Sequence, residues 1–351
     1  MIIGVPKERK VHEYRVALTP QAVKILVQKG HRVIVERGAG LGIGIGDEEF
    51  GQAGAEIASN EEEIFKKCEL VVKVKELLPH EFTLVRKDQI LFSYLHLAAN
   101  MELIEALKKS GVTAVAFETV ELPDGSLPLL SPMSRIAGRL SIQVGIHFLE
   151  KTVGGKGVLM SGAPGVRPGR VTVIGGGTVG YNAVLSALGL GADVVLIDIN
   201  PKKLEYFHEK FGGRVRTRPS YPELIKDELK ESDLVIGAVL VTGAKAPKVV
   251  NREMIAEMQR GSVFVDVAID QGGCSETSRP TSLDSPVFEV NGVIHYCVTN
   301  IPSLVSLTAS YSLSNSILPY VLKIADGKME EDGALKKGIN VHGGRLLLKL
   351  D

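Results

Sequence analysis

Residues 171–198 constrain the fold of this chain more than any other segment. They read VTVIGGGTVGYNAVLSALGLGADVVLID: a buried-strand pattern, a glycine-rich turn, a helix pattern and a second strand that ends at Asp198. The turn carries the spacing Gly175-x-Gly177-x-x-Gly180. In such a turn the first glycine permits the tight bend, the second lets the backbone approach a pyrophosphate, and the third lets the helix pack against its strand. The segment therefore predicts a β-α-β unit that binds a dinucleotide.

The acid at the end of this unit predicts which dinucleotide is bound. Asp198 follows Gly177 by 21 residues, close to the interval at which an acid binds the ribose 2′-hydroxyl. Its negative charge repels a 2′-phosphate, and the helix N-terminus after the turn favours a pyrophosphate. The alternative is a glycine-rich turn without a ligand, but the flanking strands and helix argue against it. We therefore expect NAD, rather than NADP, as the cofactor.

The composition argues against several other kinds of protein. A chain of 351 residues suggests about two domains. Lys and Arg together number 41, as do Asp and Glu, so no net charge attracts nucleic acid or an anionic membrane. The sequence has neither a signal-peptide pattern nor a run of 18 apolar residues, so we expect a cytoplasmic protein. Cys68, Cys274 and Cys297 are too widely spaced for a zinc site or a disulfide framework, and we expect reduced cysteines and no metal.

Strand and helix patterns alternate along the chain. The strand patterns lie at residues 2–5, 32–36, 70–74, 90–95 and 112–117, and again at 171–174, 194–197, 234–238 and 262–269. Helix patterns separate them, as at 21–28 and 101–109. Such alternation predicts an α/β protein with mostly parallel sheets covered on both faces. We expect two Rossmann-like, doubly wound domains.

Two long helix patterns set the expected domain boundaries. The pattern at 134–151 precedes the dinucleotide unit and is expected to connect the domains. The other opens at Pro302 and contains Pro319. If this last helix returns to the first sheet, the N-terminal domain is discontinuous and is completed by the C-terminal segment. We therefore predict a substrate domain of residues 1–128 and 306–351, and an NAD-binding domain of residues 129–305.

Basic residues follow two strands of the first predicted sheet. Ligands of open parallel sheets bind outside the carboxyl ends of the strands, so polar groups there are candidate site residues. Arg15 lies between the first strand and the first helix, where a guanidinium can grip a carboxylate with two parallel hydrogen bonds. Lys75 and Lys73 share one face at the end of another strand, and either could bind a substrate oxygen. A surface salt bridge for Arg15 and two solvated lysines on an edge strand remain the alternatives.

An imidazole and a carboxylate follow two further strands. His96 comes directly after the apolar run ILFSYL, and its imidazole can exchange protons near neutral pH. Asp270 is expected to end the strand SVFVDVAID, with Asp266 inside that strand as the weaker candidate. A structural histidine and an acid that caps the turn after the strand are the alternatives. The sequence thus offers one candidate acid–base group and one candidate carboxylate.

A resemblance to a known family rests on nine segments in order: GVPKE, EYRVALTP, VVKVKE, LFSYLHLAA, PLLSPMSRIAGRLS, GGKGVLMSGAPGV, VIGGGTVGYNA, VIGAVLVTGAKAPKVV and VAIDQGGCSETSRPTS. Together they resemble the NAD-dependent L-alanine dehydrogenases from residue 1 to about residue 325. Subunits of nicotinamide nucleotide transhydrogenase and lysine-forming saccharopine dehydrogenases are similar in architecture. They supply the two alternative functions.

The resemblance implies a reaction and roles for the strand-end residues. L-Alanine, NAD and water give pyruvate, ammonium and NADH, reversibly, so the chain is expected to be an oxidoreductase that acts on small-molecule substrates. Arg15 would bind the substrate carboxylate and Lys75 the carboxylate or the carbonyl oxygen. His96 would be the general acid–base group, and Asp270 would help to activate water. Family members are commonly hexamers, which implies a homo-oligomer.

The resemblance also implies a set of cofactor contacts that surrounds the glycine turn. They are Ser134, Gly175, Gly177, Thr178, Val179, Gly180, Asp198, Ser220, Val239, Leu240, Lys245, Ile269, Asp270, Val298 and Asn300. The presence of Arg15, Lys75, His96 and Asp270 together favours the dehydrogenase over a transhydrogenase-type binding subunit. Selectivity among small amino acids stays open, because one methylene group changes it by only roughly 1–3 kcal/mol.

Overall fold

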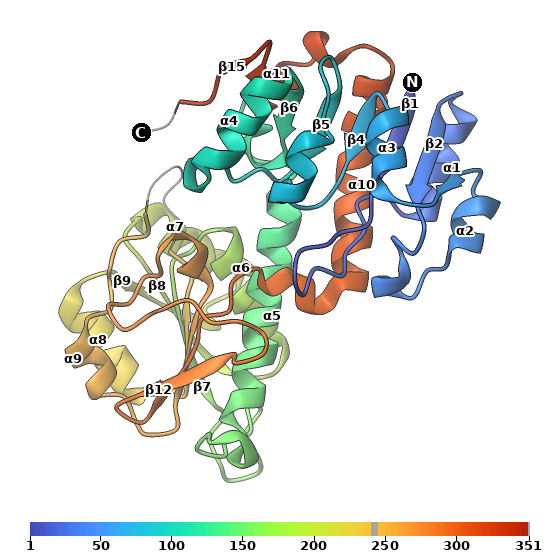
Figure 1. Cartoon of the computed structure of the whole chain (residues 1–351). Coiled ribbons are helices and arrows are strands. Elements are labelled where there is room, and N and C mark those ends of the chain that lie inside the picture. Colours follow the sequence, from blue (N-terminus) through green and yellow to red (C-terminus); the bar gives the residue numbers. More distant parts are fainter. Residues whose placement is uncertain (240–244, 350–351) are drawn as a thin grey trace. The chain divides into compact units, whose positions relative to one another are not determined.

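The chain divides into two compact units that are built from different parts of the sequence. A computed structural model describes residues 1–239 and 245–349. Residues Met1–Met133 and Ser303–Asp351 form the first unit, and residues Ser134–Pro302 form the second. In Figure 1 the first unit accordingly carries both the blue and the red ends of the colour scale.

The first unit is built on one mixed sheet. Within the described residues its strand order is β15-β14-β6-β5-β4-β1-β2-β3. The strands are β1 (Ile2–Val5), β2 (Arg32–Glu36), β3 (Glu56–Ala58), β4 (Leu70–Val72), β5 (Ile90–Ser93), β6 (Thr113–Ala116), β14 (Ile339–His342) and β15 (Arg345–Leu346). Pairing is parallel from β3 across to β6 and antiparallel from β6 to β14 and β15. Strands β1 to β6 therefore follow the doubly wound order 3-2-1-4-5-6.

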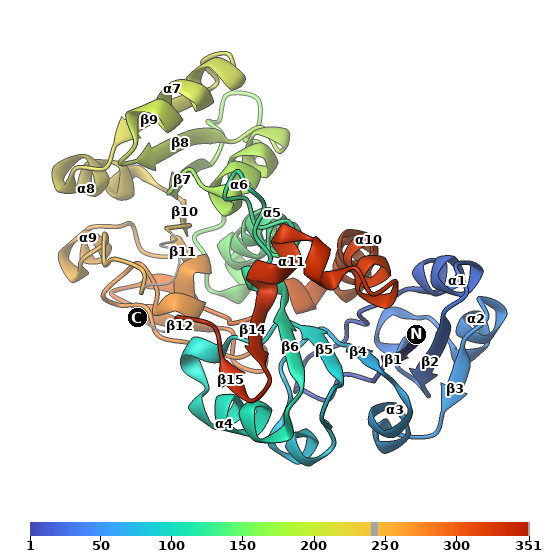
Figure 2. The same ribbon diagram turned by 90° about the horizontal axis from the view of Figure 1, so that it is seen from above.

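Helices cover both faces of this sheet. They are α1 (Pro20–Gln28), α2 (Asp47–Gln52), α3 (Glu61–Lys67), α4 (Met101–Ser110), α10 (Ser306–Ala325) and α11 (Gly333–Gly338). Figure 2 shows α1 and α10 on one face and α3 and α4 on the other. The second face buries apolar side chains of α3 and α4 against those of β4 to β6 in one continuous core.

The C-terminal helix α10 belongs to the first unit through specific hydrogen bonds. The Val16 backbone N–H donates to Ser310 Oγ at 3.0 Å, and the Thr19 N–H donates to Ser314 Oγ at 3.0 Å. Both serines are buried, so these hydrogen bonds satisfy polar groups that water does not reach. The segment after β1 therefore needs α10 for its own conformation.

The second unit repeats the doubly wound arrangement. Among the described residues its strand order is β12-β13-β11-β10-β7-β8-β9. The strands are β7 (Arg170–Ile174), β8 (Asp193–Asp198), β9 (Val215–Pro219), β10 (Leu234–Gly237), β11 (Val263–Asp266), β12 (Val287–Val290) and β13 (Val293–Tyr296). All pairs are parallel except that of the edge strand β12 with β13. The helices are α5 (Ser131–Leu149), α6 (Thr178–Gly189), α7 (Pro201–Lys210), α8 (Pro222–Glu231) and α9 (Arg252–Ala256).

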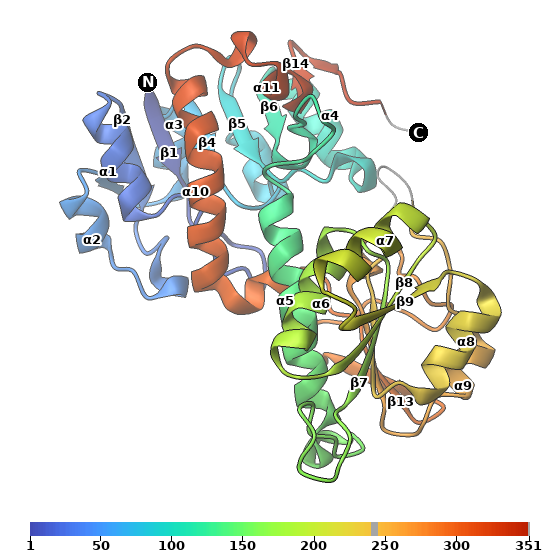
Figure 3. The same ribbon diagram turned by 180° about the vertical axis from the view of Figure 1, so that it is seen from behind.

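Helices also cover both faces of the second sheet, as Figure 3 shows, with α5 and α6 on one side and α8 and α9 on the other. Side chains of α8 and α9, such as Ile225, Leu229 and Ile255, pack against buried residues of β8, β10 and β11. The predicted fold class, two doubly wound α/β domains with the first completed by the C-terminal segment, is confirmed. None of the described helices is long and apolar enough to cross a membrane.

The bounds of several elements differ from those that the sequence pattern predicts. Strand β4 ends at Val72 rather than residue 74, although Lys73 N–H still donates to Phe92 O at 3.2 Å. Strand β11 ends at Asp266 rather than residue 269, because the Asp266 carboxylate accepts from the Ala268 and Cys274 N–H groups and turns the chain. The connecting helix α5 begins at Ser131, not at residue 134. A 3-10 helix, Ile301–Val305, precedes α10, where the pattern predicts one helix from Pro302.

Candidate active site

The candidate substrate site lies at the carboxyl edge of the first sheet. Strand β1 pairs with β2 on one side and with β4 on the other, and the order of the strands reverses there. In doubly wound sheets ligands bind outside the strand ends at this reversal. Arg15 lies in the segment that follows β1, Lys75 in the segment that follows β4, and His96 in the segment that follows β5. The three residues therefore share one edge of one sheet.

Arg15 is held by an acid two residues away. Its Nε and Nη2 donate to the two carboxylate oxygens of Glu13 at 2.6 Å each, and its Nη1 contacts Met133 Sδ at 3.2 Å. Only 2% of Arg15 is exposed, so the ion pair is buried and is not the surface salt bridge that the sequence left open. Burial lowers the pKa of Arg15, but the hydrogen bond and charge of Glu13 outweigh it and raise the net pKa. The guanidinium is thus fixed in one orientation.

A hollow of about 340 Å³ lies over this ion pair. It is lined by residues of the segment after β1, among them Glu8, Glu13 and Arg15, and by Gly38, Ala39 and Gly42. A small amino acid is well within this volume. Glu13 was not among the residues predicted from the sequence, because its contact with Arg15 is set by the folded conformation of the loop that carries both residues.

The two lysines after β4 have different surroundings. Lys73 Nζ donates to both carboxylate oxygens of the buried Glu81, at 2.6 and 2.8 Å. Lys75 is also buried, and among the residues that the structure describes its ammonium forms no ion pair. Burial, followed by the positive charge of Arg15, lowers the pKa of Lys75. Lys73 is therefore a structural residue, whereas the charge of Lys75 is only partly offset by those of Glu76 and Glu13.

Glu8 is a buried acid beside these groups that the sequence did not reveal. Its Oε1 accepts from the Val74 N–H at 2.5 Å and from the Lys75 N–H at 3.4 Å, while its Oε2 is buried without a hydrogen-bond partner. Burial raises the pKa of Glu8 to about 7, although the charge of Lys73 opposes the shift. Its acceptor role depends on a chain segment 66 residues away, which no local pattern encodes.

His96 has an unusual backbone conformation. Its φ of 48° and ψ of 41° lie in the left-handed region, which residues other than glycine rarely adopt. The Glu118 carboxylate accepts from the His96 N–H at 2.6 Å and from the Leu95 N–H at 3.1 Å. The imidazole is exposed and stacks on Tyr94, with 5.9 Å between ring centroids, and the Tyr94 hydroxyl donates to Leu129 O at 2.6 Å. The imidazole is thus accessible to solvent at the strand end.

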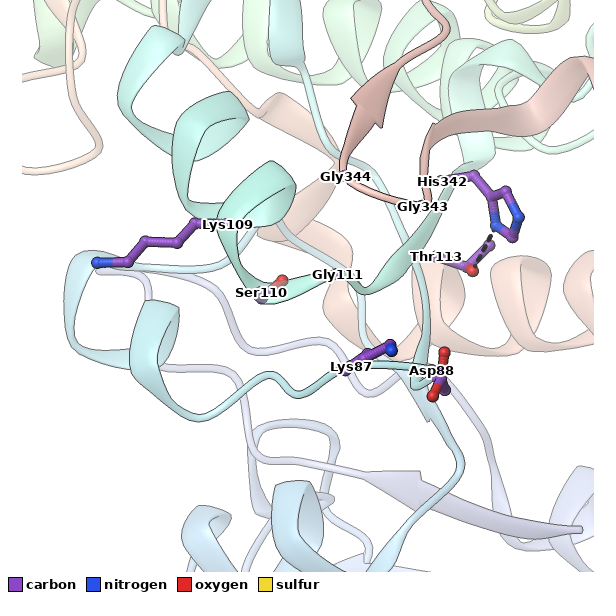
Figure 4. Close-up of a pocket in the computed structure, with 9 residues that line it drawn as sticks. All are labelled: Lys87, Asp88, Lys109, Ser110, Gly111, Thr113, His342, Gly343 and Gly344. Carbon is purple, nitrogen blue, oxygen red and sulfur yellow. Dashed lines mark hydrogen bonds between the residues drawn. The ribbon is translucent and has the colours of Figure 1, made fainter.

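A second hollow in the first unit lies at the opposite edge of the sheet. Figure 4 shows its lining, which includes Lys87 and Asp88 before β5, Gly111 and Thr113 at the start of β6, and His342 at the end of β14. His342 Nδ1 and Thr113 Oγ1 are 2.9 Å apart and bonded to each other. Because this hollow faces the amino ends of the parallel strands, it is not part of the candidate active site.

The glycine turn of the second unit fits a bound pyrophosphate. A Cβ on Gly180 would overlap the carbonyl oxygen of Gly175, and a Cβ on Gly175 would lie 2.6 Å from Ala238 O. Gly175 also has a φ of +102°. A Cβ on Gly177, in contrast, would meet no protein atom within 4 Å. The protein's own packing thus requires two of these glycines, whereas the third borders open space at the N-terminus of α6.

Asp198 ends β8 beside this turn. Its Oδ2 accepts from the Gly176 N–H at 2.6 Å and its Oδ1 from the Asn200 N–H at 2.8 Å, with Lys203 Nζ 3.6 Å from Oδ2. The carboxylate is therefore fixed next to the glycine turn. Ile199, which follows it, is 86% exposed. An exposed apolar side chain beside the glycine turn can pack against a planar ring of a bound cofactor. Ile199 was not among the residues predicted from the sequence.

Asp270 does not end strand β11, and the prediction of its position is wrong. It lies exposed in a 3-10 helix, Val267–Gln271, four residues after the strand. The residue that ends the strand is Asp266, which is buried and accepts from Ala268 N–H, Cys274 N–H and Ser278 Oγ at 3.1, 2.8 and 2.6 Å. Burial raises the pKa of Asp266 despite these bonds. The role of capping the turn thus belongs to Asp266, and Asp270 is a solvent-exposed acid.

The other predicted cofactor residues follow strands of the second sheet, with few exceptions. Val239 follows β10, Ile269 lies in the helical turn after β11, and Val298 and Asn300 follow β13, Asn300 with a φ of 57°. The Ser220 N–H donates to Asp198 O at 3.2 Å, which places it at the end of β9. Thr178 and Val179 open α6, Ser134 lies in α5, and Lys245 is exposed. Leu240 lies outside the described residues.

Fold and glycine turn together define a dinucleotide-binding α/β protein with two doubly wound units. Comparison with known proteins gives the family. Residues 4–137 match the N-terminal domain of the alanine dehydrogenase/PNT family, and residues 141–349 match its C-terminal domain. The chain belongs to this family, whose members use a nicotinamide cofactor.

Several named enzymes are similar to this chain over nearly their whole length. An alanine dehydrogenase of Mycolicibacterium smegmatis is 50% identical over 351 residues, covering 99% of this chain and 95% of the relative. A solved structure of an L-alanine dehydrogenase is 52% identical with a TM-score of 0.96, covering 99% of this chain and 97% of that one. A transhydrogenase structure from Sinorhizobium meliloti is 27% identical with a TM-score of 0.85, covering 99% of both chains.

Proposed function

We propose that this protein is an NAD-dependent L-alanine dehydrogenase, which reversibly converts L-alanine, NAD and water into pyruvate, ammonium and NADH. The main support is the edge of the first sheet, where Arg15, Lys75 and His96 follow strands β1, β4 and β5. Two cationic groups and an imidazole at one edge suit a substrate that carries a carboxylate and undergoes proton transfer. Full-length identity of about 50% to an alanine dehydrogenase supports the same reaction.

Arg15 and Lys75 bind the substrate in this proposal. The ion pair with Glu13 fixes the guanidinium through Nε and Nη2, and a substrate carboxylate binds Arg15 from the hollow that this residue lines. Lys75 contacts the same carboxylate or the carbonyl oxygen of pyruvate. Burial and the charge of Arg15 disfavour the Lys75 ammonium more than the charges of Glu76 and Glu13 favour it, so an anionic ligand stabilises it.

His96 and Asp270 carry the proton transfers in this proposal. Water, oriented by Asp270, adds to the imine carbon to give a carbinolamine. His96 takes the proton of its hydroxyl as the C–N bond breaks and ammonia leaves, and it returns the proton in the reverse direction. The nicotinamide, when bound, accepts the hydride from the α-carbon. Loss of alanine oxidation with retained NADH binding in Asp270→Asn would support the role of Asp270. Near-normal turnover in that variant would remove it.

The cofactor is NAD in this proposal, bound at the carboxyl edge of the second sheet. The open space at Gly177 accommodates the pyrophosphate, Asp198 binds the ribose 2′-hydroxyl, and Ile199 offers an apolar face to the adenine ring. The remaining contacts are those of Ser134, Gly175, Thr178, Val179, Gly180, Ser220, Val239, Leu240, Lys245, Ile269, Asp270, Val298 and Asn300. Residues 129–305 then form the NAD-binding domain, and residues 1–128 and 306–351 form the substrate domain.

The proposal extends to the state of the protein in the cell. We propose a cytoplasmic homo-oligomer, a hexamer by analogy with its family. Cys68, Cys274 and Cys297 are buried and unpaired, which suits a reducing compartment. Molecular mass in solution, measured by light scattering, tests the oligomer.

A transhydrogenase-type binding subunit is the second candidate, because a transhydrogenase structure has the same fold over the whole chain. The two functions differ at the first sheet, since a subunit that only binds NAD needs no amino-acid site. A saccharopine-type dehydrogenase would need a larger substrate.

A screen of amino acids and 2-oxo acids with NAD(H) and NADP(H) tests the proposed function. The expected result is NADH formation with L-alanine and NADH consumption with pyruvate and ammonium, followed by absorbance. NADH binding without turnover of any amino acid would favour the transhydrogenase-type subunit. Activity confined to saccharopine or lysine would favour the saccharopine-type enzyme. Either result would overturn the proposal.

A further inference from the structure

The backbone around His96 is held by an acid that no sequence pattern singles out. Glu118 follows β6, the strand next to β5 in the sheet, in the short helical turn Phe117–Thr119. Its Oε1 accepts from the His96 N–H at 2.6 Å and from the Leu95 N–H at 3.1 Å, and its Oε2 lies 3.3 Å from the Leu95 nitrogen. One carboxylate therefore binds two consecutive backbone groups.

His96 has a backbone conformation that is sterically unfavourable for a residue with a side chain. His96 has a φ of 48° and carries a Cβ, and residues other than glycine pay a steric penalty in this region. Such a conformation persists only where the surroundings fix it. Bonds from backbone N–H groups to a charged carboxylate are among the stronger hydrogen bonds in proteins. Glu118 is placed to provide this stabilisation.

The same arrangement occurs at Lys75. Glu8, in the segment after β1, accepts from the Val74 and Lys75 N–H groups at 2.5 and 3.4 Å. Strand β1 is the neighbour of β4, as β6 is the neighbour of β5. Two candidate substrate-binding positions on one sheet edge are thus each fixed by a glutamate from the adjacent strand end, which indicates a device for positioning rather than an isolated contact.

We propose that Glu118 is a positioning residue for His96. Its carboxylate holds the left-handed backbone from which the imidazole projects, and it touches neither substrate nor cofactor. This inference rests on the proposed acid–base role of His96. A displaced imidazole would slow proton transfer, since a misplacement of about 1 Å can cost about 100-fold in rate.

Three substitutions separate this positioning role from an effect of negative charge. Glu118→Gln removes the charge but keeps an oxygen at the position of Oε1, which accepts both bonds. Glu118→Asp keeps the charge but is one methylene shorter and does not reach either N–H group. Glu118→Ala removes both. Glu121→Gln is the matched control, because Glu121 pairs with Lys337 at the surface, at 2.6 Å, and with no other residue of the described ranges.

The kcat values of the three variants for alanine oxidation test the positioning role of Glu118. Glu118→Gln should stay within about fivefold of the unsubstituted enzyme, while Glu118→Asp and Glu118→Ala fall by about 100-fold. The dissociation constant of NADH, measured by fluorescence, should change by less than about twofold in all three, because the glycine turn lies in the other unit. Glu121→Gln should be unchanged in both quantities. An Asp variant as active as the Gln variant, or three variants all within twofold of the parent, would overturn the proposal.

Amide hydrogen exchange tests the same proposal without any turnover. The Leu95 and His96 amides should be protected in the parent and in Glu118→Gln, and should exchange at least about tenfold faster in Glu118→Asp. Equal protection in both variants would overturn the positioning role. If the parent enzyme does not oxidise alanine, the proposed function fails, whereas the exchange result still decides whether Glu118 holds His96.

Discussion

The two units share the order 3-2-1-4-5 of their first five strands but bind their proposed ligands with different chemistry. At the strand-order reversal of the first unit, between β1 and β4, the chain places buried charges: Arg15, Lys75, Glu8 and Glu13. At the corresponding reversal of the second unit, between β7 and β10, it places a glycine turn whose groups are mainly backbone. The sheet sets where a ligand binds, and the connection after the first strand sets which ligand it is.

The lengths of these connections explain the difference. In the second unit Ile174 ends β7 and Thr178 already begins α6, so backbone N–H groups at the helix N-terminus form the site. In the first unit residues 6–19 separate β1 from α1, which leaves room for charged side chains. Those charges must be compensated in the interior, and Glu13 and Glu81 compensate Arg15 and Lys73. The first unit therefore depends on buried acids that pair with its basic residues, and the second depends on glycines.

Substitution of His96 should have the largest effect and should separate the two units. We expect His96→Ala to lower kcat for alanine oxidation by about 1,000-fold, the middle of the range for loss of a general acid–base group. The dissociation constant of NADH should stay within about twofold, because the cofactor residues lie in the second unit. Stopped-flow absorbance and fluorescence titration measure the two quantities. The exposed His147→Ala is the control, and near-normal turnover in His96→Ala would remove the assignment.

The buried acid Glu8 should make the stability of the protein depend on pH. Its pKa is about 7 in the folded protein against an ordinary value of 4.5, so the folded state holds the proton more tightly. The stabilisation is complete below pH 4.5 and is lost as the pH rises through 7. The difference of 2.5 pKa units corresponds to about 3 kcal/mol.

Comparison with Glu8→Gln isolates this contribution, since the neutral amide imitates the protonated acid. Urea unfolding measures the free energy of unfolding of both proteins. As the pH rises from 4.5 to 8, this free energy should increase for the variant relative to the parent by up to about 3 kcal/mol. Parallel stability curves would contradict the raised pKa. They would also mean that burial of the Glu8 carboxylate in the first unit costs less free energy than the raised pKa indicates.

Two glycines of the turn should respond to the same substitution in different ways. Gly177→Ala should leave thermal stability unchanged, because the new Cβ meets no protein atom, and should weaken NADH binding by about 30-fold through overlap with the pyrophosphate. Gly180→Ala should lower the melting temperature, because its Cβ overlaps Gly175 O. Calorimetry and fluorescence titration distinguish the two effects. Unchanged NADH binding in Gly177→Ala would place the pyrophosphate elsewhere.

Substitution of Asp198 should have the smallest effect. We expect Asp198→Gly to weaken NAD binding and to reduce discrimination against NADP by about tenfold, because the repulsion of a 2′-phosphate is removed. Lys203, whose Nζ lies 3.6 Å from Oδ2, would remain and would favour the added phosphate. The ratio of kcat/KM for NAD to that for NADP measures the change. A constant ratio would show that Asp198 does not contact the ribose.

Much of the fold and the cofactor turn could be predicted from the sequence, because their signals are local. The glycine spacing at 175–180 and the alternation of strands and helices predict two doubly wound α/β units, as found. The end of β11 could not be predicted, because apolar residues continue to Ile269 while the Asp266 side chain already turns the chain through bonds to Ala268 and Cys274. Asp270 was therefore placed at a strand end and lies in a helical turn instead.

The sequence by itself determined the class of fold, the dinucleotide turn and the residues that follow the strands, since neighbours in the chain encode them. Only the tertiary structure decided how those residues are held. Glu8 bonds to Val74 across 66 positions, Glu118 to His96 across 22, and Ser310 to Val16 across 294. Hydrogen bonds between distant segments depend on which strands become neighbours in the sheet. Periodicity along the chain carries no record of that arrangement.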